Sequence, residues 1–114
     1  TEIEKLLADF TFCKVNFSYG LTSDFDMNFK YSILYIIKEA LTNVAKHSNA
    51  NLVNITLVEM KNATYLKISD NGSGALNKES GMGLFSIKKR IEELGGRLEI
   101  STVDGFRIFA TIDK

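Results

Sequence analysis

The chain has 114 residues, of which 45% are hydrophobic and 25% charged, and its fourteen basic and fourteen acidic side chains give a formal net charge of zero. This size and composition predict one globular domain over residues 1–114, with a sizeable core and no room for a second domain. The neutral charge balance argues against nucleic acid or an anionic membrane surface as a direct partner.

The first half of the chain predicts a helix, a strand and a second, longer helix. Residues 1–10 place apolar side chains at helical spacing, so we expect a short amphipathic helix there, as the tail of an upstream element. Residues 11–19 are rich in β-forming side chains, and residues 20–26 supply turn chemistry. A long helix is expected over about residues 29–46, ended by the turn-favouring residues 48–51.

Cys13 falls in the first predicted strand, and it is the single cysteine of the chain. A lone cysteine excludes an internal disulfide or a cysteine metal cluster, and it is typical of a reducing compartment. We interpret Cys13 as a small, buried, hydrophobic side chain and not as a reactive thiol.

The middle of the chain predicts a β-hairpin. Residues 53–58 and 64–69 alternate apolar and polar side chains on either side of Lys61 and Asn62. Asp70 therefore stands where a strand ends.

The last third predicts a helix over residues 84–94, stopped by two glycines, and then strands over residues 97–101 and 106–112 joined by an Asp-Gly turn. Strand pairs joined by hairpins, with helices inserted between them, predict an α+β two-layer sandwich. We expect a mixed, mostly antiparallel sheet with its helices on one face.

The long helix carries unusual polar chemistry on one side. At about 100° per residue, Glu39, Asn43 and Lys46 fall within a narrow sector, with His47 at its margin. The opposite, core-seeking stripe consists of Ile33, Ile37, Ala40, Leu41 and Val44. One face of this helix should pack into the core, and the other should face something polar.

Two glycine-rich segments follow, DNGSG at residues 70–74 and GMG at residues 81–83. Glycine lets the backbone approach a ligand closely and lets the intervening residues 75–80 move. The second segment also opens onto the N-terminus of a helix, which favours a phosphate group.

These residue types match the parts of a nucleoside triphosphate with its magnesium ion. A carboxylate at a strand end, here Asp70, can accept a hydrogen bond from the adenine amine. The amide oxygen of Asn43 can complete the shell of a Mg²⁺ ion that is bound mainly to phosphates and water. Glu39 can polarise a water or an incoming nucleophile, and Lys46 adds positive charge towards phosphate.

Other common sites fit the sequence poorly. In a calcium loop beginning at Asp70, glycines would occupy positions that need oxygen ligands. The chain has no glycine-lysine-serine/threonine phosphate loop, and the first glycine segment lacks the third glycine of a dinucleotide fingerprint. One histidine does not make a zinc site.

The three segments together resemble the ATP-binding catalytic domain of sensor histidine kinases, in the superfamily that includes gyrase-type topoisomerases, heat-shock chaperone ATPases and mismatch-repair ATPases. EALTN at residues 39–43, with Lys46 and His47, resembles the N box of that family. The two glycine segments, DNGSG and GMGL, resemble its first and second glycine boxes. The similarity extends from about Phe29 to the end of the chain.

The resemblance implies a Bergerat-type fold and a set of site roles. Asn43 would bind Mg²⁺, Glu39 would act as the base or orient it, Asp70 would read adenine, and the glycines would flank a lid. The implied nucleotide-binding residues are Asn43, Lys46, His47, Asp70, Gly72, Gly74, Gly81, Met82, Gly83 and Leu84.

The resemblance also implies the biological setting. Such a domain donates the γ-phosphate of ATP to a histidine on a separate dimerisation domain, from which a response regulator takes it. We therefore expect a cytoplasmic domain of a longer, membrane-anchored kinase, and the 114 residues alone should not autophosphorylate. The short lid resembles the subgroup whose regulators carry helix-turn-helix output domains.

One departure from the family leaves alternatives open. The family usually has Gly-Thr at the entry to the last strand, with the threonine near adenine, whereas this chain has Gly105 and Phe106. A serine kinase that regulates a sigma factor and a non-enzymatic, nucleotide-sensing scaffold both remain as alternative functions. Tyr31 and Tyr35 are expected to pack against a neighbouring helix, with stacking on a purine as the other option.

Overall fold

The computed structural model describes residues 2–47, 49–72, 81–101 and 105–113, without the side chains of residues 47 and 81–83. Its elements, in chain order, are α1 (Glu2–Asp9), β1 (Lys14–Gly20), α2 (Met27–His47), β2 (Leu52–Glu59), β3 (Ala63–Asp70), α3 (Gly81–Glu93), β4 (Gly96–Ser101) and β5 (Arg107–Asp113).

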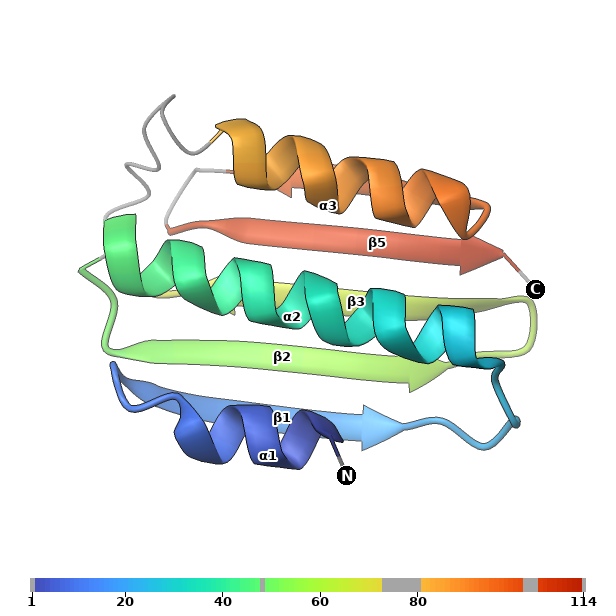
Figure 1. Cartoon of the computed structure of the whole chain (residues 1–114), viewed down its shortest axis with the longest axis horizontal. Helices are drawn as coiled ribbons and strands as arrows, with labels where there is room; N and C mark the ends of the chain where they lie inside the picture. Colours follow the sequence, from blue (N-terminus) through green and yellow to red (C-terminus); the bar gives the residue numbers. More distant parts are fainter. Residues whose placement is uncertain (1, 48, 73–80, 102–104, 114) are drawn as a thin grey trace.

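The strands form one mixed sheet with the order β1-β2-β3-β5-β4. β1 pairs in parallel with β2, and the other neighbouring pairs are antiparallel. All three helices lie on the same side of this sheet (Figure 1). The predicted two-layer α+β architecture is therefore confirmed, including the mostly antiparallel sheet.

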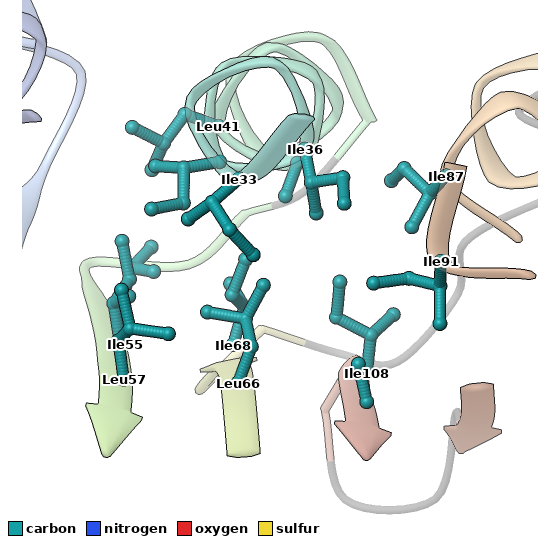
Figure 2. Packing of buried hydrophobic residues seen from close by; sticks show 14 of the residues in the cluster. Ile33, Ile36, Leu41, Ile55, Leu57, Leu66, Ile68, Ile87, Ile91 and Ile108 are labelled. Atoms are coloured by element: carbon teal, nitrogen blue, oxygen red, sulfur yellow. The ribbon is translucent and has the colours of Figure 1, made fainter. Parts of the chain in front are cut away.

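The core lies between the helix layer and the sheet. From α2, Ile33, Ile36 and Leu41 point towards the apolar side chains of β2 and β3, and from α3, Ile87 and Ile91 point towards β5 (Figure 2). The predicted stripe of α2 is confirmed, because each of its five members is at most 2% exposed. The 3.6-residue period was sufficient to identify this face, since a long helix on a sheet buries one stripe.

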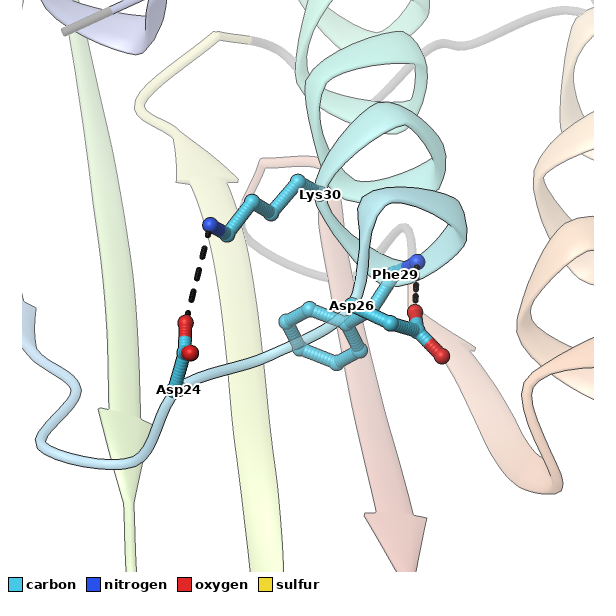
Figure 3. A network of polar contacts seen from close by, with 4 residues as sticks. All are labelled: Asp24, Asp26, Phe29 and Lys30. Carbon is cyan, nitrogen blue, oxygen red and sulfur yellow. Dashed lines mark hydrogen bonds and ion pairs between the residues drawn. The ribbon is translucent and has the colours of Figure 1, made fainter.

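Asp26 caps the N-terminus of α2. The backbone N–H of Phe29 donates to Asp26 Oδ1 at 2.8 Å, and that of Lys30 donates to the Asp26 backbone oxygen at 3.1 Å (Figure 3). The helix consequently begins at Met27, two residues before the predicted start. An aspartate cap satisfies backbone donors that the first turn leaves without helical partners.

The starts of β1 and α3 each differ by three residues from the sequence prediction. β1 begins at Lys14 and not at residue 11, because its parallel partner β2 begins at Leu52, opposite Lys14. Cys13 therefore lies one residue before the strand, where it is half-buried against the core. α3 begins at Gly81, so the second glycine segment forms the first turn of the helix instead of preceding it.

Among the described residues, no helix combines the length and the apolar character that a membrane-spanning segment needs.

Candidate functional site

The described elements that carry predicted site residues reach one end of the molecule. The C-terminal half of α2, the end of β3, the beginning of β5 and the first turn of α3 all lie there (Figure 1). Asn43 on α2 is 6% exposed and Asp70 at the end of β3 is 8% exposed, so both polar side chains are buried. The C-terminal half of α2 and the end of β3 thus lie at the same end of the molecule, and the site roles of their polar residues stay predictions.

Asp70 is held by the backbone on both sides of it. Its Oδ1 atom accepts hydrogen bonds from the backbone N–H of Gly72 at 2.8 Å and of Phe106 at 3.3 Å. The backbone N–H of Asp70 in turn donates to the carbonyl oxygen of Phe106 at 2.9 Å. One oxygen of the carboxylate is therefore fixed, and the side chain has a defined direction.

Gly105 makes this arrangement possible. Its φ angle is +101°, a conformation that L side chains rarely adopt. A Cβ atom added there would overlap with the carbonyl oxygen of Asp70. The chain therefore needs glycine at this point to bring β5 against the end of β3.

Within the described part of the chain, two buried side-chain atoms have no hydrogen-bond partner: Oδ2 of Asp70 and Nδ2 of Asn43. Leaving a buried polar atom unpaired costs about 1–3 kcal/mol, so such atoms are few in native proteins. Both atoms belong to residues that the sequence assigned to nucleotide binding. This coincidence is the strongest sign in the structure that a polar ligand completes the site.

Asn71 joins the first glycine segment to the start of β2. Its Oδ1 atom accepts from the backbone N–H groups of Asn51 and Leu52 at 3.0 and 3.1 Å. Its Nδ2 atom donates to Asn51 Oδ1 at 2.6 Å, and its backbone N–H donates to Leu52 O at 3.2 Å. Asn71 is thus a positioning residue that fixes the chain next to Asp70.

Cys13 lies within the electrostatic reach of this site. Burial raises the pKa of its thiol above the usual value, and the negative charge of Asp70 raises that pKa further. The protonated, unreactive thiol is favoured, which agrees with the interpretation of Cys13 as a structural residue.

The other predicted site residues of α2 become more exposed towards the end of the helix. Glu39 is half-buried, one turn before Asn43, and Lys46 is exposed near the end of the helix. His47 is the last residue of α2, and the structure does not describe its side chain. These positions place a carboxylate, an amide and an ammonium along one edge of the helix, as the 3.6-residue period predicts.

The glycine segments are described in part. Gly72 is half-buried beside Asp70, whereas Gly74 and the predicted lid, residues 75–80, lie outside the described residues. The backbones of Gly81, Met82 and Gly83 form the first turn of α3, and Leu84 packs against the core. The roles predicted for these residues stay predictions.

Phe106 occupies the position where the family usually has a threonine. Its side chain is 3% exposed and belongs to the hydrophobic core. Its contribution to the site comes from backbone atoms, which pair with Asp70 whatever the side chain is. This backbone role was not predicted from the sequence. The Asp-Gly turn just before Phe106 is the sequence feature that could have indicated it.

The two tyrosines behave differently. The guanidinium of Arg90 on α3 lies 3.9 Å from the ring centroid of Tyr35, so Tyr35 packs against a neighbouring helix as predicted. Tyr31 is 61% exposed and lies in the N-terminal half of α2, away from Asn43. The predicted packing is wrong for Tyr31.

The residues present fit a magnesium ion held mainly by phosphate. The described residues contain no group of three or more His, Cys, Asp or Glu side chains that could hold a metal ion by themselves. Mg²⁺ at nucleotide sites commonly takes one or two protein ligands and completes its shell with phosphate oxygens and water. The side chain of Asn43 could supply one such oxygen, because a half-turn of its amide exchanges the oxygen and the nitrogen.

Comparison with known proteins assigns the family. Residues 30–114 match the family described as "Histidine kinase-, DNA gyrase B-, and HSP90-like ATPase". This match covers most of the chain, and the chain belongs to that family.

Its curated relatives include two sensor histidine kinases of Bacillus subtilis (strain 168). The chain is 35% identical to ComP over 97 residues, which are 81% of the chain and 13% of ComP. It is 41% identical to LiaS over 73 residues, which are 61% of the chain and 20% of LiaS. The chain therefore spans only a minor part of the length of these relatives.

Solved structures show the same fold. The blue-light activated histidine kinase of Erythrobacter litoralis EL346 superposes with a TM-score of 0.77 at 19% identity, covering 97% of the chain and 42% of that structure. The histidine kinase AdeS of Acinetobacter baumannii gives a TM-score of 0.75 at 22% identity, covering 98% of the chain and 62% of that structure.

Proposed function

We propose that this chain is the ATP-binding catalytic domain of a two-component sensor histidine kinase. In this proposal it binds ATP with Mg²⁺ and presents the γ-phosphate to a histidine on a separate dimerisation domain. The observation that carries the proposal is the pair of unpartnered buried atoms, Asp70 Oδ2 and Asn43 Nδ2, at the end of the molecule where both glycine segments begin. Family membership supports ATP as the ligand that would satisfy them.

The chemistry follows from the type of each group. Asp70 Oδ2 would accept a hydrogen bond from the adenine amine, while Oδ1 stays occupied by the backbone. Asn43 would hold Mg²⁺, and Lys46 and His47 would lie towards the phosphates.

The glycine segments would supply the backbone of the phosphate site. Gly72 and Gly74 would allow close approach on one side of a lid, and Gly81, Met82, Gly83 and Leu84 would place a helix N-terminus on the other.

The reaction itself requires little covalent chemistry from the protein. The O–P bond to ADP breaks as an imidazole nitrogen of the acceptor histidine forms a bond to phosphorus, and Glu39 polarises that nucleophile. Charge neutralisation by Mg²⁺ and Lys46, together with positioning, would supply most of the catalysis.

The setting of the domain belongs to the same proposal. The names of ComP and LiaS, both sensor histidine kinases, support a dimerisation domain and a response regulator as partners. We place the chain as one domain of a longer, membrane-anchored kinase, on the cytoplasmic side where ATP is available. A helix-turn-helix response regulator, as in the short-lid subgroup, would be the recipient.

The adenine role is tested by Asp70→Asn. The amide keeps an oxygen for the backbone of Gly72 and Phe106, but it turns the unpartnered oxygen into a donor that faces the adenine amine. Affinity for ATP and for ADP should fall alike, by about tenfold to a hundredfold, because the variant loses a hydrogen bond to a charged group. Titration calorimetry measures both, and a loss confined to ATP would contradict the assignment.

The magnesium role is tested by Asn43→Ala. Removing the amide should abolish the gain in ATP affinity that Mg²⁺ confers, whereas binding of metal-free ADP changes little. Calorimetry with MgCl₂ and with a chelator separates the two contributions. If the variant binds Mg-ATP as the parent chain does, the residue has another role.

Phosphotransfer is tested with labelled ATP and a histidine-bearing dimerisation domain of the parent protein. The chain should label a histidine, and Glu39→Gln should slow the labelling while ATP affinity stays unchanged. Labelling of a serine on another protein would favour the sigma-factor kinase. Tight ATP binding without any transfer would favour the scaffold.

A further inference from the structure

A hollow lies at the end of the molecule opposite the candidate nucleotide site. It has a volume of about 980 Å³ and lies between α1, the end of β1 and the first half of α2. We call it the α1–α2 hollow, and its lining includes Ile3, Phe17, Tyr19, Met27, Tyr31 and Leu57. From Met27 to Asn43 the helix rises about 24 Å, so this hollow is separate from the candidate nucleotide site.

The hollow reaches from an exposed rim into the core. At its base, Ile33 and Leu57 are 2% and 1% exposed. At its rim, Tyr19, Met27 and Tyr31 are 59%, 57% and 61% exposed. Exposed large apolar side chains that gather at one cavity are unusual on a monomer's surface and are typical of an interaction site.

The helix beside the hollow is loosely packed. None of the eight residues of α1 is fully buried, although Ile3, Leu6 and Leu7 rest against the core. A ligand that filled the hollow would bury Ile3 and the rim of α2 at the same time. The apolar surface of α1 is thus incompletely used by the described part of the chain.

The charges at the hollow favour a basic partner. Its lining contains the carboxylates of Glu2 and Asp24. Glu2 pairs with Lys5 at 3.6 Å on the exposed surface of α1, where the two side chains are 72% and 76% exposed. The Asp24–Lys30 ion pair measures 3.9 Å, and the two side chains are 101% and 56% exposed (Figure 3). Such an exposed pair contributes little and is easily exchanged for a pair with a partner.

The lining also restricts the conformation of the partner. Eleven of its sixteen residues are hydrophobic or aromatic, so the hollow accepts apolar side chains and offers few partners for a backbone. A helix satisfies its own backbone hydrogen bonds and therefore suits a lining of this kind, whereas an extended segment would have to pair with the edge strand β1.

We propose that the α1–α2 hollow docks an amphipathic helix of a partner protein. Apolar side chains from one face of that helix enter the hollow between Phe17 and Ile33, and its Lys or Arg side chains lie against Glu2 and Asp24. This proposal is independent of the nucleotide site, because none of its residues belongs to that site.

The charge requirement is tested with two synthetic helical peptides and the 114-residue chain. The peptides share the same leucine positions, and one carries lysines and the other glutamates on the polar face. Fluorescence anisotropy should show saturable binding of the lysine peptide. The glutamate peptide should bind about tenfold more weakly or not at all, because it cannot form the few surface ion pairs that the lysine peptide forms. No binding of the lysine peptide, or equal binding of both, would overturn the proposal.

The location is tested with a matched pair of methionine variants. Met27 lines the hollow and is 57% exposed, whereas Met60 is 55% exposed and lies outside it, after β2. Met27→Ser should lower the affinity for the lysine peptide by about tenfold, and Met60→Ser should leave that affinity unchanged. Equal losses in both variants would mean non-specific binding and would overturn the assignment.

A second copy of the chain is the competing occupant. Sedimentation velocity of the chain alone should show a monomer at micromolar concentration. A dimer that Met27→Ser dissociates would show that the hollow binds another copy, and the proposed partner would then be wrong. Circular dichroism melting curves confirm that each variant is folded.

Discussion

The two carboxylate oxygens of Asp70 have different surroundings. Oδ1 is held by the backbone of Gly72 and Phe106, and Oδ2 is buried without a partner. A side chain used only for structure would pair both oxygens, because an unpaired buried acceptor lowers stability. The division leaves one carboxylate oxygen fixed by the backbone and the other without a hydrogen-bond partner.

The charge of Asp70 also acts on Cys13, which gives a prediction at this scale. Burial raises the pKa of the Cys13 thiol, and the Asp70 carboxylate adds to that increase because a negative charge disfavours the thiolate. Asp70→Asn removes the second cause and keeps the first, so the pKa of Cys13 should fall without reaching its ordinary value.

The rate of alkylation by iodoacetamide, followed across pH 7 to about 10, reports that pKa. In Asp70→Asn the rate should rise at lower pH than in the parent chain. Cys13 is the single cysteine, so no other thiol contributes. An unchanged or higher transition pH would mean that the carboxylate does not influence the thiol.

At the scale of elements, α2 connects the two ends of the molecule. Its N-terminal half lines the α1–α2 hollow, its middle packs on the sheet, and its C-terminal half carries Glu39, Asn43 and Lys46. A helix of 21 residues keeps these parts in a fixed relation because each turn is hydrogen-bonded to the next. The stability of α2 should therefore affect both sites.

The Asp26 cap provides a test of that stability. Asp26→Ala removes the acceptor for the Phe29 N–H and should lower the free energy of unfolding by about 1 kcal/mol. Asp24 is the matched control, since it lies two residues away and forms an exposed ion pair with Lys30 instead of a helix cap. Asp24→Ala should leave urea unfolding unchanged, and equal effects of the two variants would contradict the capping role.

At the scale of the whole molecule, Gly105 links the fold to the site. It allows β5 to approach the end of β3, and through Phe106 it holds Asp70. The close contact joins segments that are 35 residues apart in the chain, from Asp70 to Gly105. The packing of the sheet therefore decides the position of the buried carboxylate.

A pair of glycine variants tests this link. Gly95 has φ +81° and open space around its Cβ position, so Gly95→Ala should cost only backbone strain of about 1 kcal/mol. Gly105→Ala adds an overlap with the Asp70 carbonyl and should cost several kcal/mol. Thermal unfolding measures both, and the folded fraction of Gly105→Ala should also bind ATP more weakly. Similar losses in both variants would show that the contact is unimportant.

Much of the fold and of the candidate site was predictable because local patterns report local structure. The buried stripe of α2 and the hairpin of β2 and β3 follow from residue spacing, and the buried polar residues Asn43 and Asp70 are ones that a motif resemblance singled out. Cys13 illustrates the limit, since its position just before β1 depends on where the partner strand β2 begins.

The sequence alone determined the buried stripe of α2 and the hairpin of β2 and β3, and it singled out side chains whose chemistry suits a nucleotide and its metal ion. Only the tertiary structure decided that Asn71 ties the glycine segment to β2, that the Phe106 backbone holds Asp70, and that a hollow opens beside α1. The physical reason is distance along the chain: these contacts join segments whose approach is set by the packing of the whole sheet and not by any local pattern.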